Sequence, residues 1–179
     1  MRIKRYFLVL VALIAFTLQS FAQEGTTGIQ FFQGTFNEAL VKAKQENKVL
    51  FVDFYAVWCV PCKKMAKTVF TQEEVGKFFN EHFVSIQLDA EKGDNVNIAK
   101  NYKVVAYPTV AFISPDGKAI SVNTGAMNKD ELLDAAKIAA GQSMSFEAIY
   151  EKYKADNNDL DVQQQLLLKA PSFLQAQEG

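Results

Sequence analysis

Between Val49 and Tyr55 the sequence has an apolar run that is interrupted only by Asp53. A run this short and this apolar is typical of a β-strand buried on both faces, as in a sheet covered by helices. The chain can fill the core that such a sheet needs, since 49% of its residues are hydrophobic and 15 are Phe. We therefore predict an α/β fold.

Hydrophobic periodicity and turn signals predict the other elements. Strands are expected at 29–32, 83–88, 109–114 and 119–124, and helices after Thr35, from Pro61 to about Phe70, after Thr71, at 95–102 and from Asn128 to Gly141. The last two strands are joined by Ser114-Pro115-Asp116-Gly117, which is a strong signal for a hairpin turn. Strands separated by helices in this order imply a central mixed β-sheet flanked by helices.

Three of the helix starts match a capping box, in which the first residue and an acidic residue three positions later each bond a backbone N–H of the other. The pairs are Thr35 with Glu38, Thr71 with Glu74, and Asn128 with Glu131. At the other end of the last of these helices, Gly141 suits the left-handed conformation that ends a helix.

The residues after Gly141 differ in character from those before. Residues 142–179 are predicted to form a C-terminal helical extension, with one helix near 146–153 and a second from Leu160 that ends at Pro171. We expect the apolar positions of this extension to pack on the domain at 29–141. The alternative is that they bind a partner.

The first 22 residues have the three-part layout of a secretory signal peptide. Arg2, Lys4 and Arg5 are basic, residues 7–18 form an apolar run, and Ser20 and Ala22 place small side chains before the expected cleavage after Ala22. The alternative is an uncleaved anchor, but the apolar run is shorter than the roughly 20 residues that a spanning helix needs. We therefore predict an exported protein, periplasmic if the source is Gram-negative and otherwise secreted, with no stable membrane insertion after cleavage.

The charge of the chain offers no support for a nucleic-acid partner. The net charge is −1 and the basic residues are spread along the sequence. Binding to nucleic acid needs a clustered basic face. An anionic membrane surface is equally unsupported as a partner.

The chain has two cysteines, both within Cys59-Val60-Pro61-Cys62. A structural disulfide stabilises a fold mainly by closing a long loop, and a bridge across two residues constrains almost nothing. Structural zinc takes four Cys or His ligands, which two cysteines and the single His82 do not complete, and no third protein ligand suggests catalytic zinc. The spacing therefore favours redox chemistry without a metal.

Pro61 suits the first turn of a helix, which places Cys59 at the helix N-terminus. Free backbone N–H groups and the helix dipole favour an anion there, and they lower the pKa of a thiol from its usual value of about 8.5. Cys59 is the predicted nucleophile. Cys62, one turn further on, is expected to lie deeper and to attack a mixed disulfide formed at Cys59.

The segment Val52–Met65 resembles the active-site strand and helix of thioredoxins nearly position by position. Tyr107-Pro108-Thr109 is similar to the cis-proline loop of that family, and Asp116-Gly117 and Thr124-Gly125-Ala126 fall where thioredoxins have turns. The resemblance covers about residues 29–141. It implies a thioredoxin fold and thiol–disulfide oxidoreductase activity that needs no cofactor.

The resemblance also implies roles for single residues. Asp53 resembles the buried acid that helps to deprotonate the second cysteine; its alternative role is a strand-end residue paired with the backbone. The family role is favoured because a carboxylate inside an apolar strand otherwise costs stability. Pro108 is expected to be cis, which leaves the backbone of Tyr107 free to pair with an extended substrate. The implied substrate-contacting residues are Trp58, Val60, Pro61, Tyr107 and Pro108.

Two departures from the family pattern concern this site. Val60-Pro61 replaces the usual Gly-Pro, and the lysine that neighbours the buried acid in many thioredoxins aligns best with Ser85.

The stretch 71–89 is similar to the C-terminal domains of thiol–disulfide interchange proteins, which favours a reductase of protein disulfides that is itself reduced by a membrane carrier. Two alternatives remain open. One is an oxidase or isomerase, although such enzymes often have His between the cysteines and this chain does not. The other is a binding module with a helical tail.

Overall fold

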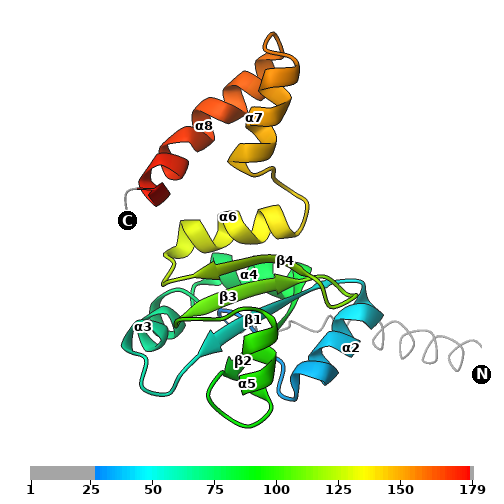
Figure 1. Cartoon of the computed structure of the whole chain (residues 1–179), viewed down its shortest axis with the longest axis vertical. Helices are drawn as coiled ribbons and strands as arrows, with labels where there is room; N and C mark the ends of the chain where they lie inside the picture. Colours follow the sequence, from blue (N-terminus) through cyan, green and yellow to red (C-terminus); the bar gives the residue numbers. More distant parts are fainter. Residues whose placement is uncertain (1–26, 178–179) are drawn as a thin grey trace, which may run out of the picture.

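The structure, a computed structural model, describes residues 27–177, so the predicted signal peptide at 1–22 lies outside the described residues (Figure 1). The elements in chain order are α2 (Phe36–Glu46), β1 (Val49–Tyr55), α3 (Val60–Thr68), α4 (Glu73–His82), β2 (Phe83–Asp89), α5 (Asn95–Asn101), β3 (Thr109–Ile113), β4 (Ala119–Thr124), α6 (Lys129–Ala139), α7 (Phe146–Ala155) and α8 (Leu160–Gln177).

The strands form a four-stranded mixed sheet in the order β2-β1-β3-β4. β1 runs parallel to β2 and antiparallel to β3, and the hairpin of β3 and β4 is antiparallel. The predicted α/β fold with a central mixed sheet is confirmed. The five inner residues of β1 are buried, as the apolar run indicated.

Helices cover both faces of the sheet and divide the core in two. Alternate side chains of β1 supply both halves, because successive residues of a strand point to opposite faces. Leu50, Val52 and Phe54 pack against α2 and α5, whereas Phe51 packs against α3, α4 and α6. The ring centroid of Phe51 lies 4.7 Å from that of Phe79 and 5.3 Å from that of Phe112.

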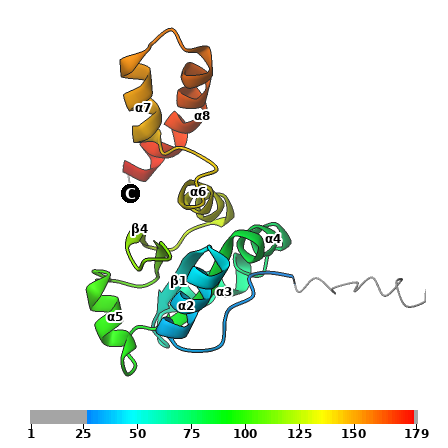
Figure 2. The ribbon, with the colours of Figure 1, turned by 90° about the vertical axis from the view of Figure 1, so that its right-hand side faces the viewer.

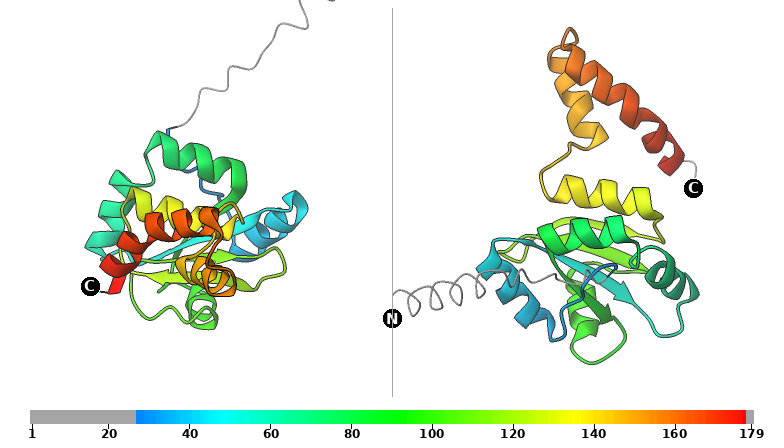
Figure 3. Two further views of the ribbon diagram at one scale, coloured as in Figure 1. Left: turned by 90° about the horizontal axis from the view of Figure 1, so that it is seen from above. Right: turned by 180° about the vertical axis from the view of Figure 1, so that it is seen from behind.

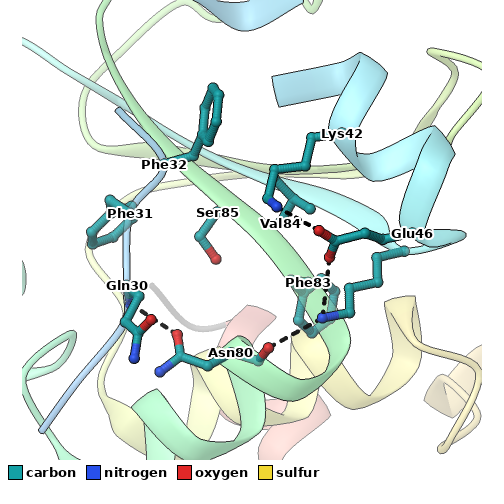
Figure 4. A pocket seen from close by; sticks show the side chains of 10 residues that line it. Gln30, Phe31, Phe32, Lys42, Glu46, Asn80, Phe83, Val84 and Ser85 are labelled. Carbon is teal, nitrogen blue, oxygen red and sulfur yellow. Dashed lines mark hydrogen bonds and ion pairs between the residues drawn. The ribbon is translucent and has the colours of Figure 1, made fainter. Parts of the chain in front are cut away.

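The strand predicted at 29–32 is wrong: among the described residues this segment makes one β-bridge, between Phe31 and Ser85, and no ladder. The backbone N–H of Ile29 donates to the carbonyl of Phe70 at 2.8 Å rather than to β2. The start of the segment is therefore held by the turn that follows α3. Figure 4 shows the pocket of 310 Å³ beside this segment, where Ser85 Oγ is buried without a hydrogen bond among the described residues.

Two of the three predicted capping boxes are confirmed, at Thr35–Glu38 and at Asn128–Glu131. The third is wrong. The N-cap of α4 is Gln72 and makes no side-chain cap bond, while the Thr71 hydroxyl donates to the carbonyl of Lys67 at 2.8 Å. The Thr71 hydroxyl is therefore bonded to the preceding turn of the chain and does not cap α4.

α7 and α8 lie side by side, beyond α6 and away from the sheet (Figures 2 and 3). Ile149 and Val162 are buried, and Lys169 Nζ lies 3.3 Å from Asp134 Oδ2 on α6. The expectation that the apolar positions pack on the domain is wrong for four residues. Tyr150, Leu160, Leu167 and Leu168 are 44%, 76%, 76% and 72% exposed.

The predicted helix end at Pro171 is also wrong, since α8 continues to Gln177. A proline removes one intrahelical hydrogen bond and strains the preceding turn, but a helix can continue past it. None of the helices within residues 27–177 combines the length and the apolar character that crossing a bilayer requires.

Candidate active site

Cys59 and Cys62 form a disulfide, with their Cα atoms 5.4 Å apart. Cys59 is the N-cap of α3 and has an extended backbone, and its Sγ accepts the backbone N–H of Cys62 at 3.2 Å. Pro61 lies in the first turn, where its missing N–H is not needed. The pair thus stands at a helix N-terminus, as predicted, where a thiolate is favoured over a thiol.

Both cysteines are buried, with Cys59 1% and Cys62 5% exposed. The expected difference in depth, with Cys62 the deeper, is therefore wrong. Ala56 packs against the pair, and the partly buried rings of Tyr55 and Tyr107 close around them. Because Tyr107 comes from the distant loop before β3, this shielding could not be read from the residues around the cysteines.

Trp58 projects beside the disulfide and is 64% exposed. Its ring centroid lies 6.1 Å from that of Tyr107, and its Nε1–H donates to Glu91 Oε2 at 2.9 Å. Glu91 is a site residue that the sequence did not indicate. The largest exposed apolar side chains at this end of the molecule belong to Val57, Trp58, Val60 and Val105.

The Tyr107–Pro108 peptide bond is cis, as predicted. The loop is held on both sides: the Thr109 hydroxyl donates to the carbonyl of Ala106 at 2.8 Å, and the N–H of Gly125 donates to the carbonyl of Pro108 at 2.8 Å. Within the described part of the chain, the backbone N–H and C=O of Tyr107 have no hydrogen-bond partner. They remain available to an extended peptide.

Asp53 lies on β1 and is 2% exposed. Its parallel partner on β2 is Gln87, whose Nε2–H donates to Asp53 Oδ2 at 2.9 Å. Burial raises the pKa of Asp53 to about 6, and the hydrogen bond from Gln87 acts in the opposite direction. Ser85, the position that aligns with the lysine of many thioredoxins, pairs with Phe51, so the residue directly beside Asp53 on β2 is Gln87.

A cavity of 290 Å³ joins the Asp53 carboxyl to the second cysteine. It is lined by Asp53, Tyr55, Ala56, Val57, Cys62, Lys63, Ala66 and Gln87. A water molecule takes about 30 Å³ in the liquid, so the space is large enough for water to carry a proton between the two groups. In the part of the chain described, no group of three or more His, Cys, Asp or Glu side chains is placed to hold a metal.

A CxxC disulfide at a helix N-terminus, facing a cis-proline loop at the end of a four-stranded mixed sheet, defines a thioredoxin-type protein. The chain belongs to that family: residues 36–140 match the family model of the thioredoxin-like domain.

The relatives of the chain include thioredoxins, which align over most of their length, and larger proteins, of which only a part aligns. It is 36% identical to a thioredoxin H-type of Oryza sativa subsp. indica over 111 residues, which are 62% of this chain and 84% of the relative. It is 34% identical to the thiol:disulfide interchange protein DsbD of Pseudomonas fluorescens over 80 residues, 44% of this chain. The match spans 14% of that relative, so most of DsbD has no counterpart in the alignment.

A solution structure of a candidate disulphide-isomerase from Bacteroides thetaiotaomicron is similar to this chain, with a TM-score of 0.59 and 42% identity. The similarity covers 66% of this chain and 98% of that one. The oxidised C-terminal domain of DsbD from Neisseria meningitidis has a TM-score of 0.51 and 27% identity, over 60% of this chain and 97% of that one.

Proposed function

We propose that this chain is a thiol–disulfide oxidoreductase that reduces disulfides in other proteins. The observation that carries the proposal is the Cys59–Cys62 disulfide at the N-terminus of α3, beside a cis-proline loop. The disulfide closes too short a loop to stabilise the fold, so a reactive role accounts for it better than a structural one.

The proposed reaction transfers two electrons from the reduced pair to the substrate. The Cys59 thiolate attacks one sulfur of a substrate disulfide, forming a mixed disulfide and releasing a substrate thiolate. Cys62 then loses its proton to Asp53 and attacks Cys59 Sγ. The Cys59–Cys62 disulfide forms, and the second substrate sulfur leaves as a thiolate that takes up a proton.

Substrate binding is proposed to use the exposed surface around the disulfide. Trp58, Val60 and Pro61 are exposed and offer apolar contacts next to the cysteines. Tyr107 and Pro108 come from the loop before β3; Pro108 is buried, and the unpaired backbone of Tyr107 can add an extended substrate segment by strand pairing. An extended peptide can therefore bring its disulfide to Cys59 in a fixed orientation.

The proposal includes the compartment in which the reaction takes place and the direction in which electrons are transferred. The predicted signal peptide at 1–22 supports export, to a periplasm in a Gram-negative source. The similarity to DsbD supports a reducing role. A reductase in an oxidising compartment needs a supply of electrons, which we assign to a membrane thiol–disulfide reductant. The partners are then this reductant and disulfide-containing proteins.

The decisive test is insulin reduction with dithiothreitol as electron source. Wild type is expected to accelerate the reaction, Cys59→Ser to fall to the uncatalysed rate, and Cys62→Ser to accumulate mixed disulfides. Ser143→Ala, in the loop between α6 and α7, is the control and should match wild type. Normal turnover by Cys59→Ser would contradict the proposal.

A second candidate function is oxidation or isomerisation of disulfides. It is supported by the similarity to a protein disulfide-isomerase of Zea mays, 30% identical over 110 residues, which are 60% of this chain and 20% of the relative. The reduction potential separates the two functions. A value near about −270 mV, as in thioredoxin, supports the reductase, whereas one near about −120 mV, as in the strong bacterial oxidant, would make the protein a disulfide donor.

A further inference from the structure

Gln87 is an exposed residue of β2 that touches the buried acid of the site. It is the register partner of Asp53, and the 2.9 Å bond from its Nε2–H is the one side-chain hydrogen bond that the Asp53 carboxyl makes among residues 27–177. On the opposite side of β1, the residue facing Asp53 is Val110 of β3, which is fully buried and apolar. The orientation of the carboxyl therefore depends on Gln87.

The charged and titratable neighbours of Asp53 are few. Tyr55 on the same strand, and Cys62 and Lys63 on α3, line the same cavity as Asp53 and Gln87. Asp89 lies two residues beyond Gln87 on β2 and faces Tyr55 in the strand register. None of these side chains is hydrogen-bonded to the Asp53 carboxyl in the described residues.

The carboxyl of Asp53 has to be ionised in order to accept a proton from Cys62. Burial in the apolar strand disfavours that form, and a donated N–H favours it. An ionised carboxylate also gains more from a donor than a neutral acid does. The amide of Gln87 is therefore placed to counter the cost of burial without adding a charge.

We propose that Gln87 is a positioning residue, which keeps the Asp53 carboxyl ionised and turned toward the cavity so that it can deprotonate Cys62. The inference rests on the proposed function, because it assigns Gln87 to the resolving half of that reaction. The Cys62 proton passes across the cavity to Asp53. The Cys62 thiolate then attacks Cys59 Sγ, the bond from Cys59 to the substrate breaks, and the substrate sulfur leaves as a thiolate.

The test uses two substitutions with opposite expected effects. Gln87→Met keeps the length of the side chain and removes the donor. The Asp53 carboxyl should then bind its proton about tenfold more tightly, which raises its pKa. Gln87→Lys brings a cation to the same place, so the pKa should fall. Gln45→Met, at an exposed glutamine of α2, is the matched control.

The direct measurement is the pH midpoint of the Asp53 carboxyl ¹³C resonance in the reduced protein, assigned by its loss in Asp53→Asn. The expected order of midpoints is Gln87→Lys below wild type, and Gln87→Met above it, with Gln45→Met equal to wild type. Equal midpoints in all four proteins would overturn the inference, as would a rise in Gln87→Lys.

The second measurement is the pH profile of insulin reduction. If the midpoint moves from about 6 to about 7, the ionised fraction of Asp53 at pH 6 falls about fivefold. Turnover by Gln87→Met should fall similarly at pH 6 and recover to the wild-type rate by about pH 8.5. A uniform loss at every pH would mean a merely structural role and would overturn the inference. Absence of insulin reduction in wild type would refute the proposed function, whereas the carboxyl midpoints would still decide whether Gln87 holds Asp53.

Discussion

The carboxyl group of Asp53 shows how the surroundings of one residue set its chemistry. It lies on a strand whose neighbouring side chains are apolar, and burial raises its pKa from 3.8 to about 6. A group with a pKa near neutrality can take a proton and release it again at physiological pH. The same burial has a consequence for the stability of the fold.

Asp53 should make the fold less stable as the pH rises. The folded state binds the proton more tightly than the unfolded chain, so ionisation destabilises the folded state. The penalty is absent below about pH 4, develops between pH 4 and about 6, and is complete above that range. A pKa difference of about 2 pH units corresponds to about 3 kcal/mol.

Asp53→Asn removes this penalty while keeping an oxygen that can accept the Gln87 amide. We expect the free energy of unfolding of Asp53→Asn to exceed that of wild type by up to about 3 kcal/mol at pH 8 and to match it at pH 4. Urea denaturation at the two pH values measures the difference. A gain of the same size at both would show that the ionisation of Asp53 is not its cause.

At the scale of elements, the starts of the helices show that a threonine can either cap the helix that follows it or bond to the turn that precedes it. In the capping box of α2, the Thr35 hydroxyl accepts the N–H of Glu38, and the Glu38 carboxylate accepts the N–H of Thr35 at 2.8 Å. The bonds that the Glu38 carboxylate accepts from the backbone N–H and the hydroxyl of Thr35 hold the pKa of Glu38 below its usual value. Thr71 precedes α4 but bonds back to Lys67 instead.

The two threonines should therefore differ when each is replaced by alanine. Thr35→Ala removes an N-cap and is expected to lower the free energy of unfolding by about 1 kcal/mol. Thr71→Ala removes an exposed bond to the last turn of α3 that is not an N-cap, and should change it by less than about 0.5 kcal/mol. Urea denaturation of the two variants beside wild type measures this. A larger loss in Thr71→Ala would mean that its hydroxyl stabilises α4 after all.

At the scale of the whole molecule, the sheet with its helices and the α7–α8 pair are packed separately. The two halves of the core draw on α2 to α6 and the strands, while Ile149 and Val162, which are the buried residues of the C-terminal pair up to residue 170, belong to neither half. The ion pair of Lys169 and Asp134 joins α8 to α6 and is partly exposed, and such pairs contribute little stability.

Removal of the C-terminal pair should leave the domain folded. We expect a chain that ends at Gln142 to keep its insulin-reducing activity within about twofold, since elements with few shared contacts unfold independently. Thermal unfolding followed by circular dichroism, together with the insulin assay, measures this. Loss of the folded state would show that α7 and α8 belong to the domain, and loss of activity alone would give them a part in binding the substrate.

Much of the fold and of the site followed from local features of the sequence. The apolar run of β1, the capping boxes at Thr35 and Asn128 and the hairpin turn after β3 each act through residues that are near in sequence. The same holds for Cys59, which lies at a helix N-terminus because Pro61 follows it in the first turn. Short-range sterics and hydrogen bonds are sufficient to fix such features.

Contacts between distant segments were decided by the tertiary structure. The strand register placed Gln87 rather than Ser85 beside Asp53, and the loop before Pro108 brought Tyr107 over the cysteines. Glu91 reached Trp58 in the same way. A shift of two residues along β2 keeps the same face of the strand, so the alternation of side chains does not reveal it. The sequence by itself determined which residues begin the helices and carry the dithiol, whereas packing and register determined which groups surround them.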